Sequence, residues 1–221
     1  MKHTTILLSS AYLAPVSYYT KLYAYPHACI ERFDHYRKQT YRNRCVIDTA
    51  NGIQSLTIPT EHSETGKTYM RDIRISDHGN WRHIHWNAFV SAYRQSPFFD
   101  YYADEFHRFF EPGRYSFLFD FNLDLCKWIC EQVDIHPLLS VTDEYMLQPP
   151  PDTDDYREQF TPKASYAVLD PSFTPLPYYQ VFRAKGQFMP DLSIVDLLFN
   201  MGPESLIILR ESLIKDEDTK N

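Results

Sequence analysis

Glycine is scarce in this sequence, with only 6 among the 221 residues. Loops that hold the phosphates of a nucleotide against a helix usually need several closely spaced glycines. The chain contains neither a GxGxxG segment nor a Walker-type GxxxxGK segment. A Rossmann dinucleotide site and a P-loop are therefore excluded, and we expect no cofactor.

Cysteine is also rare, and the four cysteines form no CxxC pair. Structural zinc sites usually draw on such closely spaced ligands, so we expect no metal site. Cys126 and Cys130 are four residues apart in an apolar stretch, which places both thiols on one face of a helix. Buried, reduced thiols are typical of cytoplasmic proteins, so the sequence predicts a cytoplasmic location.

Long apolar runs and excess positive charge are absent too. No stretch approaches the roughly 20 apolar residues that a membrane-spanning helix needs. The apolar run before Ser9 is too short for a secretion signal and indicates a buried first strand. The net charge is −7, from 22 Lys and Arg against 29 Asp and Glu. We expect no membrane span, and the acidic balance disfavours nucleic acid as a partner.

Strand-like and helix-like apolar spacings alternate along the chain, which predicts an α/β fold. We expect a mixed sheet, a β-hairpin, and a largely helical central and C-terminal portion. The predicted strands cover 4–10, 27–31, 44–48, 53–58, 71–75, 138–142 and 178–182. The predicted helices cover 15–24, 81–95, 97–111, 116–133 and 193–201, with a further helix from Pro203.

One domain is expected over residues 1–214, followed by a polar tail over 215–221. The hairpin is predicted from Asn51-Gly52, since both residues accept the positive φ of a tight turn. Residues 148–164 combine several prolines and aspartates, which predicts an exposed loop that is either functional or disordered.

The turn after the first strand is the first candidate site. Ligands in open α/β sheets bind beyond the carboxyl ends of the strands, so Ser10 and Tyr12 are candidates for substrate binding. The alternative is an ordinary polar turn.

A basic and aromatic cluster over 36–44 is the second candidate. Its guanidinium and ammonium groups suit phosphate, and its tyrosines could stack on a sugar or base. The alternative is a solvated basic loop. The candidate binding residues of this cluster are Tyr36, Lys38, Arg42, Asn43 and Arg44.

Two further groups lie on predicted helices. His85 is a candidate general base, with a hydrogen-bonded core histidine as the alternative, and Trp81 is a candidate substrate-binding residue. Asp191 precedes the C-terminal apolar helix and Asn200 lies on it, and these residues either contact a ligand or clamp the structure. No Ser-His-Asp or Cys-His arrangement can be derived from the sequence.

Several segments together resemble the WbqC-like family. They occur in order and span nearly the whole chain, and the Tyr36-x-Lys38 with Asn43-Arg44 pattern and the string LSIVDLLFNMGPES are the most specific. The resemblance is greatest to the branch found in Bacteroides-like bacteria. The matching segments are 9–22, 36–59, 80–106, 155–163 and 178–205.

The resemblance implies a role in surface-polysaccharide (O-antigen-type) biosynthesis, because the family takes its name from a gene of such clusters. It implies work on sugar or nucleotide-sugar intermediates. Together with the basic and aromatic cluster, it supports a transferase-like enzyme whose partner is a phosphorylated or nucleotide-activated sugar, with acyl or aminoacyl transfer to an amino sugar as one reaction. Other members carry a His-Gln pair where this chain has Ser9-Ser10. That departure supports the alternative of a non-catalytic binding or scaffolding protein of the same pathway.

Overall fold

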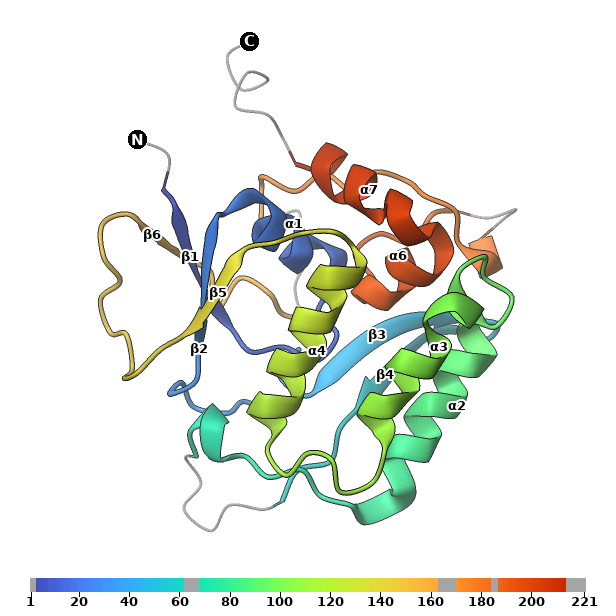
Figure 1. The fold of residues 1–221 in the computed structure, drawn as a ribbon, viewed down its shortest axis with the longest axis horizontal. Coiled ribbons are helices and arrows are strands. Elements are labelled where there is room, and N and C mark those ends of the chain that lie inside the picture. The colour runs from blue at the N-terminus through green and yellow to red at the C-terminus, as the bar shows by residue number, and fades with distance from the viewer. Residues whose placement is uncertain (1–2, 62–67, 163–169, 184–186, 214–221) are drawn as a thin grey trace.

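A four-stranded parallel sheet lies at one side of the molecule (Figure 1). The computed structural model describes residues 3–61, 68–162, 170–183 and 187–213. The strand order is β5-β2-β1-β6. The strands are β1 (Thr5–Ser9), β2 (His27–Glu31), β5 (Leu138–Val141) and β6 (Thr153–Asp155).

The two central strands are joined by a helical crossover, which parallel neighbours require. Helix α1 (Val16–Ala24) links β1 to β2, and Thr5 pairs with His27 at the start of the two strands. Ile6, Leu7 and Leu8 of β1 are fully buried, as expected for a strand with neighbours on both sides. The register leaves Ser9 beside Glu31 at the carboxyl ends.

A separate antiparallel hairpin forms a second, two-stranded sheet. It consists of β3 (Arg44–Thr49) and β4 (Gly52–Thr57). Gly52 has a φ of 97°, which explains the glycine at this tight turn. Helix α2 (Trp81–Tyr93) packs against β3.

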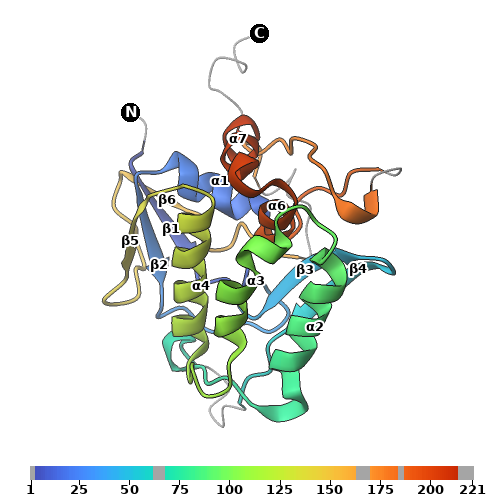
Figure 2. The same cartoon turned by 45° about the vertical axis from the view of Figure 1, so that its right-hand side comes forward.

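The remaining helices build the rest of the core. They are α3 (Phe99–His107), α4 (Leu118–Gln132), α6 (Ile194–Met201) and α7 (Ser205–Glu211). Helices α4, α3 and α2 follow one another in the same order in both views (Figure 2). The Phe106 ring lies 5.1, 5.6 and 5.4 Å from the rings of Phe110, Trp128 and Phe199, so aromatic packing joins α3, α4 and α6. Single 3₁₀ turns span Met70–Asp72, His78–Asn80, Arg108–Phe110, Val181–Arg183 and Gly202–Glu204.

The predicted α/β class is confirmed, although parallel and antiparallel pairs lie in two separate sheets rather than one mixed sheet. Two predicted strands are wrong. Residues 71–75 overlap the 3₁₀ turn at Met70–Asp72 and make only isolated bridges, and 178–182 overlap the turn at Val181–Arg183. Both segments are short, and no adjacent strand among the described residues is available to pair with them. Their apolar side chains alone therefore do not produce a β-strand.

The prediction of an exposed loop over 148–164 is also wrong in part. Thr153, Asp154 and Asp155 pair in parallel with β1 and form the edge strand β6. Residues 163–164 and the predicted polar tail over 215–221 lie outside the described residues. Among the described helices, none has the length and apolarity to cross a membrane.

Candidate functional site

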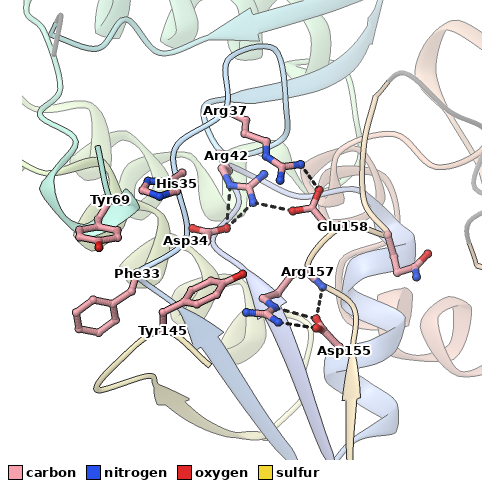
Figure 3. A pocket seen from close by; sticks show the side chains of 11 residues that line it. Phe33, Asp34, His35, Arg37, Arg42, Tyr69, Tyr145, Asp155, Arg157 and Glu158 are labelled. Atoms are coloured by element: carbon pink, nitrogen blue, oxygen red, sulfur yellow. Dashed lines mark hydrogen bonds and ion pairs between the residues drawn. The ribbon is translucent and has the colours of Figure 1, made fainter. Parts of the chain in front are cut away.

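A pocket of about 500 Å³ opens at the carboxyl ends of the parallel strands (Figure 3). Chain segments that follow β2, β5 and β6 meet here, because parallel strands end at the same edge of their sheet. Ligand sites are expected at such edges. The lining residues are Phe33, Asp34, His35, Arg37, Arg42, Tyr69, Tyr145, Asp155, Arg157, Glu158 and Gln159.

Arg157 anchors one wall of the pocket. Its Nε and Nη2 donate to the two oxygens of Asp155 at 2.9 and 2.6 Å, and its Nη1 donates to Glu31 Oε2 at 3.3 Å. Burial raises the pKa of Asp155, but hydrogen bonds from Arg157 outweigh it and hold that pKa below its ordinary value. The Glu31 carboxylate is fully buried and also accepts the Thr142 hydroxyl at 2.7 Å. The Asp155 carboxylate is therefore ionised at neutral pH, and hydrogen bonds hold both carboxylates of this wall in place.

Arg42 anchors the opposite wall. Its Nε and Nη2 donate to Asp34 Oδ2, and its Nη2 donates to the Ser9 hydroxyl at 2.9 Å. The Ser9 hydroxyl lies 3.0 Å from both Asp34 Oδ2 and the carbonyl oxygen of Arg157, so it connects the two walls. Asp34 Oδ1 is buried and has no hydrogen-bond partner in the described part of the chain.

The mouth of the pocket carries a third arginine. Arg37 Nη1 donates to Glu158 Oε2 at 2.5 Å, and Glu158 Oε1 lies 3.7 Å from Arg42 Nη2. The side chains of Arg37 and Glu158 are 60% and 59% exposed, whereas that of Arg42 is 5% exposed. The lining therefore balances three guanidinium groups with three carboxylates, and the ion pair at the mouth is the most exposed to solvent.

Aromatic rings form the other half of the pocket. The His35 and Tyr69 rings stack at 5.2 Å with an interplanar angle of 9°, and Phe33 meets Tyr69 edge-on at 6.2 Å. The Arg157 guanidinium lies 5.1 Å from the centre of the Tyr145 ring. Flat aromatic surfaces beside oriented polar groups suit a ligand with one apolar face and several hydroxyl groups, such as a sugar ring.

Among the sequence-predicted residues of the basic cluster, Arg42 alone lines this pocket. Lys38 is exposed, and Tyr36 is half-buried and packs against the core. Asn43 is buried and donates to the Ile58 carbonyl at 2.9 Å, while Arg44 donates to Thr57 at 3.2 Å. The structure thus places Asn43 and Arg44 at the hairpin rather than at the pocket.

Ser10 and Tyr12 are both buried beneath the turn after β1. The Ser10 hydroxyl accepts a hydrogen bond from Asn122 at 3.0 Å and borders a separate cavity of about 10 Å³ behind Arg42. The Tyr12 hydroxyl lies 2.9 Å from His85 Nδ1.

His85 lies in the core beside Trp81, at a ring distance of 5.1 Å, and is outside the lining of the pocket. Burial lowers the pKa of His85 to about 4. Its imidazole is therefore neutral at pH 7 and hydrogen-bonded within the protein.

Asp191 and Asn200 act within the fold. Asp191 accepts the Ser17 backbone N–H at 2.8 Å and the Ser17 hydroxyl at 3.1 Å, and burial raises the pKa of Asp191 to about 6. Asn200 Nδ2 donates to the Asp196 carbonyl at 2.7 Å within α6. Neither residue lines the pocket.

The sequence analysis missed most residues of the pocket. Asp34 follows a correctly predicted strand, so its position at a strand end was a usable signal. Asp155 is the last residue of β6, and Arg157 and Glu158 follow it, but the sequence analysis did not recognise this segment as a strand. In the described ranges, no group of three or more His, Cys, Asp or Glu side chains is arranged to hold a metal ion.

Comparison with known proteins agrees with the resemblance noted in the sequence. The chain is 27% identical over 199 residues to the uncharacterized protein Rv1507c of Mycobacterium tuberculosis, covering 79% of this chain and 84% of the relative. No solved structure matches this chain. The model of the WbqC-like protein family matches residues 10–156, which is more than half of the chain and includes β2 to β6. The chain belongs to the WbqC-like protein family.

Proposed function

We propose that the protein is a transferase-like enzyme of surface-polysaccharide biosynthesis, and that the pocket binds a phosphorylated or nucleotide-activated sugar. Family membership supports the pathway. The single observation that carries the site is the pocket at the strand ends, with an aromatic half beside a charged half. A sugar or base would stack on Tyr69, and Asp155 and Arg157 would bind hydroxyl groups.

The proposed proton acceptor is His35. Its imidazole lines the pocket and is exposed, whereas His85, favoured by the sequence, is enclosed by Tyr12 and Trp81. A general base must come within hydrogen-bond distance of the proton that it removes. In this proposal His35 accepts the proton of an attacking sugar hydroxyl or amine.

A binding assay tests the pocket. We expect calorimetry to detect binding of UDP-N-acetylglucosamine or glucose 1-phosphate, and Tyr69→Ala to weaken it about tenfold by removing the stacking surface. Tyr101→Ala is the matched control, because Tyr101 lies on α3 and is 79% exposed outside the pocket. Equal affinities of the two variants would contradict the proposed site.

The rival function is a non-catalytic binding or scaffolding protein of the same pathway. Two observations favour it: Arg37, Arg42 and Arg157 already have carboxylate partners, and the described residues of the pocket lining include no serine or cysteine nucleophile. Mass spectrometry of the bound sugar, incubated with candidate acyl donors, separates the two. Turnover that His35→Gln abolishes without loss of binding supports the enzyme, and binding without turnover supports the rival.

A further inference from the structure

The Glu158 carboxylate occupies a distinctive place at the pocket mouth. Glu158 Oε2 lies 2.5 Å from Arg37 Nη1, and Glu158 Oε1 lies 3.7 Å from Arg42 Nη2. The carboxylate therefore lies between two guanidinium groups (Figure 3). Arg37 and Glu158 are 121 residues apart in the chain and meet only through the fold. A carboxylate between two arginines fills the position that a bound phosphate would take.

The two arginines are held very differently. Arg42 is 5% exposed and is fixed by hydrogen bonds to Asp34 and Ser9. Arg37 and Glu158 are mostly exposed, and an exposed ion pair of this kind contributes little to stability. Glu158 can therefore leave the position at little cost, while Arg42 remains oriented.

We infer that Arg37 and Arg42 form an anion subsite for a phosphate group of the substrate, and that Glu158 occupies this subsite until the phosphate displaces it. The inference rests on the proposed function, because it places the charged end of an activated sugar. A phosphate carries more charge and more acceptor oxygens than a carboxylate, so it competes effectively for the two guanidinium groups. Glu158 would thereby disfavour neutral sugars and weakly charged ligands.

Removing the built-in competitor should strengthen anion binding. In calorimetric titrations with inorganic pyrophosphate, we expect Glu158→Gln to bind about twofold to fivefold more tightly than the wild type, since the exposed pair is weak. Arg37→Met should bind more weakly than the wild type by at least a similar factor. Because Glu158 is exposed, its substitution should leave the urea midpoint of unfolding unchanged, which verifies that the variant is folded.

Glu111→Gln is the matched control. It removes the same charge from an exposed glutamate that lies 3.9 Å from Arg114, outside the pocket lining, and should bind pyrophosphate like the wild type. Equal or weaker binding by Glu158→Gln, an equal gain in Glu111→Gln, or no pyrophosphate binding by any variant would overturn the inference.

The two proposals fail in distinguishable ways. If UDP-N-acetylglucosamine binds with the expected dependence on Tyr69 but Glu158→Gln has no effect on pyrophosphate, the anion subsite is wrong and the proposed function stands. If Glu158→Gln strengthens pyrophosphate binding but no sugar derivative binds, the anion subsite stands and the proposed sugar substrate is wrong.

Discussion

Two histidines of this chain show how the surroundings of a residue decide its role. His85 is enclosed by the rings of Tyr12 and Trp81, and burial keeps its imidazole neutral at pH 7. His35 is exposed and stacks on Tyr69 at the pocket. The sequence offered His85 as a candidate general base and a hydrogen-bonded core histidine as the alternative, and the structure buries His85 in the core.

His85 predicts a specific pH dependence of stability. The folded protein protonates this group only near pH 4, whereas the unfolded chain does so near pH 6.5. As pH falls through this window, the unfolded state gains a proton that the folded state does not, so the folded state is destabilised. We expect the wild type to lose about 3 kcal/mol more than His85→Gln between pH 7 and pH 4.

Urea unfolding at the two pH values measures this difference. The other titrating groups are common to both proteins and cancel in the comparison. His83→Gln removes an exposed imidazole from the same helix and should follow the wild type. An identical loss of stability in the wild type and in His85→Gln would contradict the prediction.

At the scale of elements, local patterns were sufficient where a segment had a strong apolar period or a turn signal. The runs that became β1 and β2, and the Asn51-Gly52 turn of the hairpin, were placed correctly. Strand β6 was missed because its three residues, Thr153 to Asp155, are polar. Their strand conformation comes from pairing with the buried β1, a tertiary effect that local propensity does not contain.

Ion pairs join the end of β6 to the rest of the sheet, and they are made by Arg157, two residues after the strand. Arg157 is the guanidinium partner of Glu31 at the end of β2, and Glu31 is fully buried. Removing one member of a buried pair leaves an uncompensated charge. We therefore expect Arg157→Met to lower the free energy of unfolding by about 3 to 5 kcal/mol, measured by urea denaturation.

The exposed arginine at the pocket mouth provides the comparison. Arg37→Met removes a solvent-exposed partner of Glu158 and should cost less than about 1 kcal/mol. The double variant Glu31→Gln with Arg157→Met should recover part of the loss, because it removes the stranded charge. A cost for Arg157→Met as small as that for Arg37→Met would show that the buried network is not stabilising.

At the scale of the whole molecule, the pocket exists only because the topology brings several chain segments to one sheet edge. Phe33 to Arg42 follow β2, Tyr145 follows β5, and Arg157 and Glu158 follow β6. Sequence spacing could not predict that these segments lie together, because their proximity depends on the order of the strands in the sheet. Two signals did point to that wall: the family resemblance included residues 155–163, and the loop over 148–164 was predicted to be either functional or disordered. Membership of the Bacteroides-type branch stays a prediction.

Another cavity, of about 320 Å³, lies beside Trp86 and His107, away from the pocket at the strand ends. A crystal structure of the protein with UDP-N-acetylglucosamine therefore tests the proposed site most directly. We predict a ring of the ligand against Tyr69 and a phosphate between Arg37 and Arg42, with the Glu158 carboxylate displaced. A ligand seated beside Trp86 and His107, with the pocket at the strand ends empty, would contradict the assignment of the site.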